Sequence, residues 1–246
     1  MIWQASAKTP AARRPGRQLM VKYDMEKDNV ILMPDTNVWG DYWVNIEAYR
    51  YESKKKKSKK NISNPADIVA LVGSAIDKKK IIIPVIIHRE IHGVIRHRFA
   101  NNSSLNLGKN KKKILETAIK KADRMHAEYR PVSVDFTEDS RKRASKVYED
   151  IRNDNTPEMM EKKTKWALKK KGKRWEELGS LKKKMPPDDY ESNPEYKDIK
   201  ILASAVEAAR EKRVVLITHD RDFTVFSEEI CRKLPVDVAD ANSPVR

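Results

Sequence analysis

Cysteine and glycine are scarce in this chain of 246 residues, and their scarcity excludes several kinds of site. Cys231 is the single cysteine, so the chain forms neither an intrachain disulfide nor a cysteine-based zinc cluster. A chain without disulfides fits a reducing compartment, and we expect a cytoplasmic location. The seven glycines show no nucleotide-binding spacing, which argues against a kinase or an ATPase.

Long hydrophobic runs are also missing. No apolar run approaches the roughly 20 residues that cross a bilayer, and no signal-peptide core is visible, so we expect no membrane association. Residues 1–27 contain Pro10, Pro15 and Gly16 but no apolar period, and we predict a disordered basic arm there. A targeting peptide has a similar composition and is the alternative interpretation.

Positive charge is what the chain has in abundance. It carries 52 Lys and Arg against 36 Asp and Glu, which leaves a net charge of +16. Such an excess favours a polyanionic partner, most simply nucleic acid. The charge therefore indicates a class of partner, but it indicates no reaction.

Short, wholly apolar segments alternate with helical patterns along most of the chain. Residues 30–34, 80–85 and 214–218 are typical of strands buried on both faces, and 131–136 and 235–238 are predicted as further strands. Helices are expected at about 38–51, 65–77, 86–99, 111–129, 194–212 and 223–231. This alternation predicts an α/β fold with a central, mostly parallel sheet.

Residues 137–190 differ from the rest in composition. Lys, Arg and Glu dominate this segment, and it contains two predicted helices, 138–152 and 160–181. We interpret it as a basic helical insertion into a main domain made of residues 28–136 and 191–246. Its predicted RNA-binding residues are Lys169, Lys170, Lys171, Lys173 and Arg174, because basic side chains neutralise phosphates and the nearby indoles of Trp166 and Trp175 can stack on bases. A solvated helix that packs its tryptophans on an apolar side is the alternative.

Four carboxylates lie against core-forming segments, where an uncompensated acid is costly. Two of them follow buried strands, and two share a helix face with buried aliphatic residues; they are Asp35, Glu90, Asp198 and Asp220. Sites in parallel α/β sheets form beyond the carboxyl ends of the strands, so we expect the four to gather there. Like charges in one place repel unless a cation compensates them. The pattern therefore predicts an oxygen-only site for Mg²⁺ or Mn²⁺.

Three of the four acids also have a purely structural interpretation. An Asp after a strand commonly caps the next helix, which applies to Asp35 and Asp220, and Glu90 has basic neighbours to pair with. His88 and His92 have a spacing that can bind zinc, but Arg89 stands where the zinc-protease motif has Glu. We expect those two histidines to be surface residues.

At these acids the chain resembles the PIN-domain nucleases. The matching segments are Val30–Asn37, Pro84–Ile91, Asp198–Ala205 and Leu216–Phe223, in the order of the family. The resemblance implies a PIN-like three-layer α/β/α fold, RNA as substrate, and Mg²⁺ or Mn²⁺ bound by Asp35, Glu90, Asp198 and Asp220. It also implies supporting roles for Asn37 and Thr218, with Asp222 either a fifth acid or a helix cap.

The resemblance thus predicts a metal-dependent endoribonuclease that acts in RNA processing or decay. One alternative is the toxin of a toxin–antitoxin pair, with an antitoxin or another protein as partner, although the small toxins of the family lack a lobe like residues 137–190. A second alternative is a non-catalytic RNA-binding protein built on a nuclease frame. A homo-oligomer is compatible with all of these interpretations.

Overall fold

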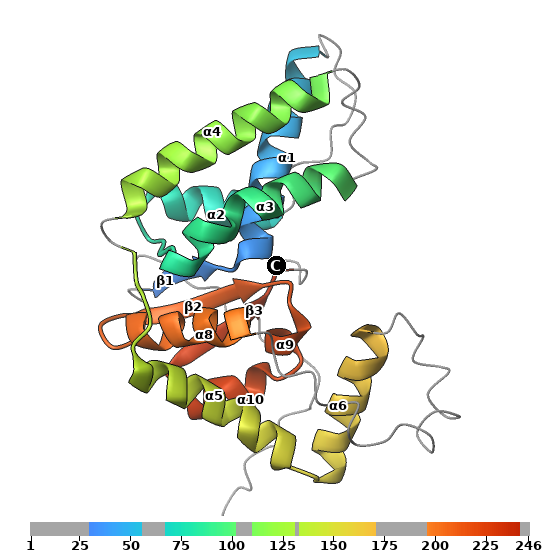
Figure 1. The fold of residues 1–246 in the computed structure, drawn as a ribbon, viewed down its shortest axis with the longest axis vertical. Helices are drawn as coiled ribbons and strands as arrows, with labels where there is room; N and C mark the ends of the chain where they lie inside the picture. Colours follow the sequence, from blue (N-terminus) through green and yellow to red (C-terminus); the bar gives the residue numbers. More distant parts are fainter. Residues whose placement is uncertain (1–29, 56–66, 102–109, 131–132, 171–195, 242–246) are drawn as a thin grey trace, which may run out of the picture.

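The protein is described by a computed structural model that covers residues 30–55, 67–101, 110–130, 133–170 and 196–241. The predicted N-terminal arm lies outside these residues. A small sheet crosses the middle of the molecule, with helices above and below it (Figure 1). None of the described helices has the length and the apolar composition that a bilayer crossing requires.

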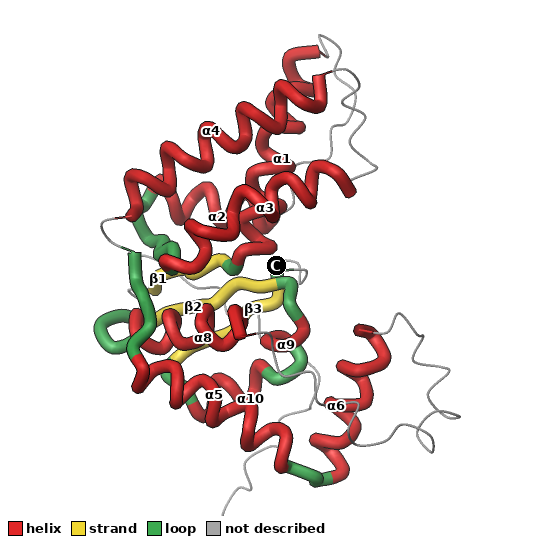
Figure 2. Tube along the Cα trace, in the orientation of Figure 1, coloured by secondary structure: helices red, strands yellow, loops and turns green. Residues whose placement is uncertain are grey.

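Three parallel strands form the sheet in the order β1-β2-β3 (Figure 2). They are β1 (Val30–Pro34), β2 (Arg213–Thr218) and β3 (Val236–Asp240). Val30 pairs with Arg213 and Val214 with Val236, so the central strand β2 connects its neighbours in register. All three strands were predicted, and the parallel α/β architecture is confirmed.

Two further predicted strands are wrong. Ile81 forms only an isolated parallel bridge with Leu32, and helix α3 (Val85–Asn101) begins directly after Pro84. Proline has no N–H group, so a ladder cannot continue through it. The strand predicted at 131–136 is absent from its described part, 133–136. Among the described residues, that part is joined to the start of α3 by one main-chain hydrogen bond, from Val85 N to Val134 O at 3.1 Å. The isoleucines of 81–83 are nevertheless core residues, which is why they resemble a strand in sequence.

The layer above the sheet consists of α1 (Thr36–Lys55), α2 (Asp67–Asp77), α3 and α4 (Lys111–Tyr129) (Figure 1). It packs on the sheet face formed by Val30, Leu32, Val215 and Ile217. Helices α1 and α3 approach very closely at Gly40, where a Cβ atom would lie 2.5 Å from Val94 Cγ1. A side chain at position 40 would therefore force Val94 or the two helices to shift.

The layer below the sheet consists of α5 (Glu138–Asn153), α8 (Tyr196–Ala208), α9 (Arg221–Thr224) and α10 (Ser227–Lys233). It covers the opposite sheet face, formed by Met33, Val214, Leu216 and Val236. Successive β2 residues thus alternate between the two layers, as the period of a strand requires.

Helices α5 and α6 (Pro157–Lys170) belong to the segment that we predicted as an insertion. Ala144, Val147 and Ile151 of α5 are buried in the same hydrophobic cluster as α8 and β2, so α5 is part of the lower layer. Lys162 connects α6 to α10, with Nζ 2.8 Å from a carboxylate oxygen of Glu228 and 2.7 Å from one of Glu229. The boundaries of the insertion stay a prediction.

Candidate functional site

Acidic residues gather where β1 and β2 end, at the carboxyl edge of the sheet. Asp35 follows β1, and Asp220 comes two residues after β2. Asp35 N donates to Ile217 O at 2.9 Å, which extends the pairing of the two strands by one residue. The parallel register therefore brings both acids to the same edge.

Asp35 is buried and has two structural partners. Its Oδ1 accepts a hydrogen bond from Val38 N at 2.8 Å, as a helix cap does, and its Oδ2 accepts one from the Thr218 hydroxyl. Burial, with a smaller contribution from the charge of Asp220, raises the pKa of Asp35 to about 6 against the effect of these hydrogen bonds. The capping interpretation of Asp35 is thus confirmed, and the carboxyl holds its proton more tightly than an exposed Asp does.

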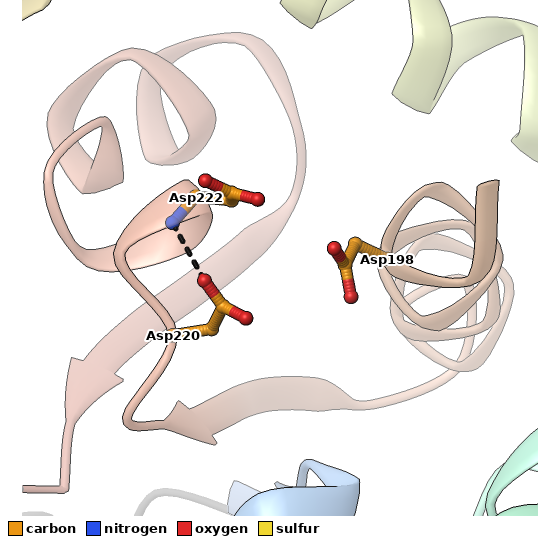
Figure 3. A group of neighbouring side chains, drawn as sticks. All are labelled: Asp198, Asp220 and Asp222. Carbon is orange, nitrogen blue, oxygen red and sulfur yellow. Dashed lines mark hydrogen bonds between the residues drawn. The ribbon is translucent and has the colours of Figure 1, made fainter. Parts of the chain in front are cut away.

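Three other carboxylates form a compact group. One oxygen each of Asp198, Asp220 and Asp222 lies within 4.8 Å of the other two. Asp198 comes from the first turn of α8, whereas Asp220 and Asp222 come from the start of α9 across from it (Figure 3). Asp198 and Asp222 are buried and Asp220 is half-buried. An oxygen-only donor set of this kind suits a hard divalent cation.

The residues around the acid group hold it in place. Asp220 N donates to Thr218 Oγ1 at 2.8 Å, and Asp222 N donates to Asp220 Oδ1 at 2.9 Å (Figure 3). Trp166 of α6 donates its indole N–H to Asp222 Oδ1. Thr218 therefore contacts both Asp35 and Asp220, and it couples the ends of β1 and β2.

Tyr148 of α5 supports the group from below. Its hydroxyl donates to the main-chain oxygen of Asp222 at 2.9 Å. Burial, together with the negative charges of the neighbouring aspartates, raises the pKa of Tyr148 well above its ordinary value. The phenol consequently stays protonated at neutral pH and remains a hydrogen-bond donor.

A pocket of about 270 Å³ opens beside the acid group. It is lined by both acidic and basic side chains: Asn37, Arg98, Trp166, His219, Asp220, Arg221 and Asp222. Acidic and basic side chains thus line one small site together. Such a pocket suits a ligand that carries negative charge and is bound together with a cation.

Behind the pocket, Asp41 of α1 connects two of the basic residues. Its Oδ1 is 3.2 Å from Arg98 Nε, and its Oδ2 is 3.1 Å from His219 Nε2. Burial lowers the pKa of His219, but the contact with Asp41 and the charge of Asp35 outweigh burial and raise it above 6.5. Asp41 therefore favours the charged form of the histidine.

The structure divides the predicted site residues into two sets. Among the described residues, the compact acid group contains Asp198 and Asp220 but neither Asp35 nor Glu90. Glu90 is half-buried and accepts a hydrogen bond from Thr36 Oγ1 at 3.1 Å, next to Asp35. Thr218 and Asn37 are both at the site, the latter with Oδ1 3.5 Å from Arg98 Nη2.

Asp222 is the acid whose role the structure changes. We predicted it as either a fifth acid or the cap of the following helix. Asp220 caps α9 instead, because its side chain accepts from the N–H of Asp222. Asp222 contributes its carboxylate to the acid group, so the capping alternative for this residue is wrong.

The predicted RNA-binding residues lie at and beyond the end of α6. Lys169 and Lys170 are the last two residues of α6, and the structure describes their main chain alone. Lys171, Lys173 and Arg174 lie outside the described residues. The expectation that His88 and His92 are plain surface residues is wrong for His88. Its Nδ1 lies 2.8 Å from His126 Nδ1, and its Nε2 lies 2.6 Å from Ser133 Oγ.

Sequence reasoning missed Arg98, Asp41 and Tyr148. Asn37 and Asp41 are four residues apart, which places them on one face of a helix that starts at the site, and this spacing was a usable signal. No local pattern marks Arg98 or Tyr148, because each reaches the site from a helix distant in sequence. Comparisons with known proteins add no assignment: no family model matches the chain, and neither a curated protein nor a solved structure matches it.

Proposed function

We propose that this protein is a metal-dependent endoribonuclease that hydrolyses RNA phosphodiester bonds in RNA processing or decay. The observation that carries the proposal is the group of Asp198, Asp220 and Asp222, whose ligand oxygens lie within 4.8 Å of one another at the carboxyl edge of a parallel sheet. The net charge of +16 supports a polyanionic substrate.

The donor set fits Mg²⁺ or Mn²⁺. Three carboxylates this close repel one another, and two of them are buried, so the arrangement is costly unless a cation offsets the charge. Asp198, Asp220 and Asp222 would hold the ion. A divalent cation supplies an activated water and compensates the negative charge that develops on a cleaved phosphate.

The chain's own residues orient this chemistry. Thr218 fixes Asp220 by accepting a hydrogen bond from its main-chain N–H. Trp166 of α6 and Tyr148 of α5 fix Asp222. Buried hydrogen bonds to a carboxylate and its backbone restrict its rotamers, so less reorganisation is needed when substrate binds. Thr218 also connects Asp35 to the group, because its hydroxyl donates to Asp35 Oδ2.

The proposed family is the PIN-like nucleases, on the basis of the sequence segments described above. Asp35, Asp198 and Asp220 occupy the edge where that resemblance expects acids, and Glu90 is connected to it through Thr36. We propose Asp222 as an additional member of the acid set, since its carboxylate belongs to the compact group.

Cleavage of an end-labelled RNA pool tests the proposal. Wild-type protein is compared in Mg²⁺, Mn²⁺ and EDTA with Asp198→Asn, Asp220→Asn and Asp139→Asn. Asp139, in the first turn of α5, serves as the matched control. It is an exposed acid away from the site, and it is ion-paired with Arg210. We expect metal-dependent cleavage that falls about a hundredfold or more in the two site variants and is unchanged in the control.

The product ends and the failures are informative. The resemblance to the PIN-domain nucleases implies 5′-phosphate and 3′-hydroxyl ends. Ends that carry a 2′,3′-cyclic phosphate would contradict attack by an activated water. Equal activity of Asp198→Asn and wild type would contradict the assigned site. RNA binding without cleavage in any metal would favour the non-catalytic RNA-binding protein instead.

A further inference from the structure

The pocket beside the acid group also has basic lining residues that the proposed acid chemistry does not use. Arg98 of α3 and Arg221 line it together with Asp220 and Asp222. A phosphodiester carries one negative charge and is repelled by the carboxylates. A fixed guanidinium near the acids would therefore supply attraction that the acids alone do not.

The position of Arg98 depends on the close crossing of α1 and α3. A Cβ atom at Gly40 would lie 3.2 Å from Arg98 Cγ, so the stem of the arginine runs directly along α1 at this glycine. Farther along the side chain, Nε is 3.2 Å from Asp41 Oδ1 and Nη2 is 3.5 Å from Asn37 Oδ1. Two residues one turn apart on α1 thus orient the guanidinium.

These contacts leave part of the donor capacity of Arg98 for a ligand. A guanidinium has five N–H groups in a planar fork, and the two contacts with α1 account for two of them. Arg98 lines the pocket and Asp41 does not, so a ligand meets the arginine and not the carboxylate behind it. Asp41 also contacts His219, and its charge is shared between two basic groups.

We propose that Arg98 binds a phosphate group of the nucleic acid in this pocket and that Asp41 is its positioning residue. The proposal deepens the proposed nuclease function and rests on it for the identity of the ligand. The same arrangement would hold the phosphate beside the acid group, because both line one pocket of about 270 Å³.

The salt dependence of binding tests the role of Arg98. A labelled single-stranded RNA is titrated with full-length protein from about 50 to 200 mM salt in Mg²⁺, with Asp198→Asn present in every variant to block cleavage. Each lost phosphate contact reduces the slope of log K against log salt by about 0.7 for a single strand. We expect this reduction for Arg98→Gln.

Arg96→Gln is the matched control, since Arg96 is an exposed arginine two residues away on the same helix and does not line the pocket. It removes the same net charge from α3. We expect its slope to equal that of the protein that carries Asp198→Asn alone. Equal slopes for Arg96→Gln and Arg98→Gln would overturn the proposal, because a general loss of charge would then explain the effect.

Asp41→Asn tests the positioning role. We expect it to weaken RNA binding when Arg98 is present and to have no further effect in the Arg98→Gln background, since the two residues then act as one unit. Independent, additive effects would show that Asp41 does not act through Arg98. A circular dichroism spectrum and a melting curve identify any variant that fails to fold, and Arg98→Met then replaces Arg98→Gln, because it also removes the charge and keeps an unbranched apolar stem.

The outcomes separate this proposal from the nuclease proposal. If the wild type cleaves RNA but Arg96→Gln and Arg98→Gln have equal salt slopes, the nuclease proposal is supported and the phosphate site is contradicted. If the slope of Arg98→Gln is reduced but the wild type cleaves RNA in no metal, the phosphate site is supported and the nuclease proposal is contradicted. Absence of RNA binding by the parent protein would overturn both.

Discussion

The two helical layers treat their buried ionisable groups differently. In the upper layer, buried Glu47 accepts from Lys121 at 2.7 Å, and buried His126 contacts His88 at 2.8 Å. In the lower layer, buried Asp198 and Asp222 lie beside a third acid of the same charge. The first arrangement gives each buried group a polar partner within a core, whereas the second concentrates charge at an edge of the sheet. Pairing within a core explains the upper layer, and for the lower layer we propose a bound cation.

The histidine pair of the upper layer gives the largest expected effect, and it depends on pH. Burial, reinforced by His88, lowers the pKa of His126 from 6.5 to about 3. Between these values the unfolded chain binds a proton that the folded protein does not. The contribution of neutral His126 to the free energy of unfolding is therefore fully present above about pH 6.5. It is lost as the pH falls towards 3, by up to about 5 kcal/mol.

The measurement is urea unfolding of wild type and His126→Asn across this pH range. We expect the free energy of unfolding of the variant to change less with pH, because Asn does not titrate. Among the described residues, His126 Nε2 is buried without a hydrogen-bond partner, so a proton added there would have no acceptor. Identical pH profiles for the two proteins would contradict the assigned pKa.

The crossing of α1 and α3 gives an intermediate effect. We expect Gly40→Ala to destabilise the protein by about 1–3 kcal/mol, since its Cβ atom would lie 2.5 Å from Val94 Cγ1 and the helices would have to separate. Gly93→Ala is the control on the partner helix, because no atom lies within 4 Å of the added Cβ. That change should stabilise by up to about 1 kcal/mol through helix propensity. Melting temperatures of the two variants that shift in the same direction would refute the packing argument.

The acid group gives the smallest expected effect on stability. It also tests most directly the difference between the buried ionisable groups of the two layers. In EDTA, Asp220→Asn should stabilise the protein by about 1 kcal/mol, because it removes one of three like charges and keeps the oxygen that caps α9. Added Mg²⁺ should raise the melting temperature of wild type and leave that of the variant unchanged. A Mg²⁺ shift of equal size in both proteins would place the ion elsewhere.

Much of the architecture followed from local patterns. The apolar runs at 30–34 and 214–218 form strands because neither face can be exposed to water, and Asp35 and Asp220 follow them at the edge where parallel strands end. The same reasoning failed for 80–85. An apolar run records burial but not hydrogen bonding, and Pro84 together with the early start of α3 limits this segment to one bridge.

The sequence by itself therefore determined the parallel strands, the layer-forming helices and the placement of acids just beyond the strands, since these depend on residues close together in the chain. Only the tertiary structure decided that Asp222, and not Glu90, lies with Asp198 and Asp220. It also brought Trp166, Tyr148 and Arg98 to the site from three separate helices. Distances between such side chains depend on how helices cross and pack, and packing is a property of residues far apart in sequence.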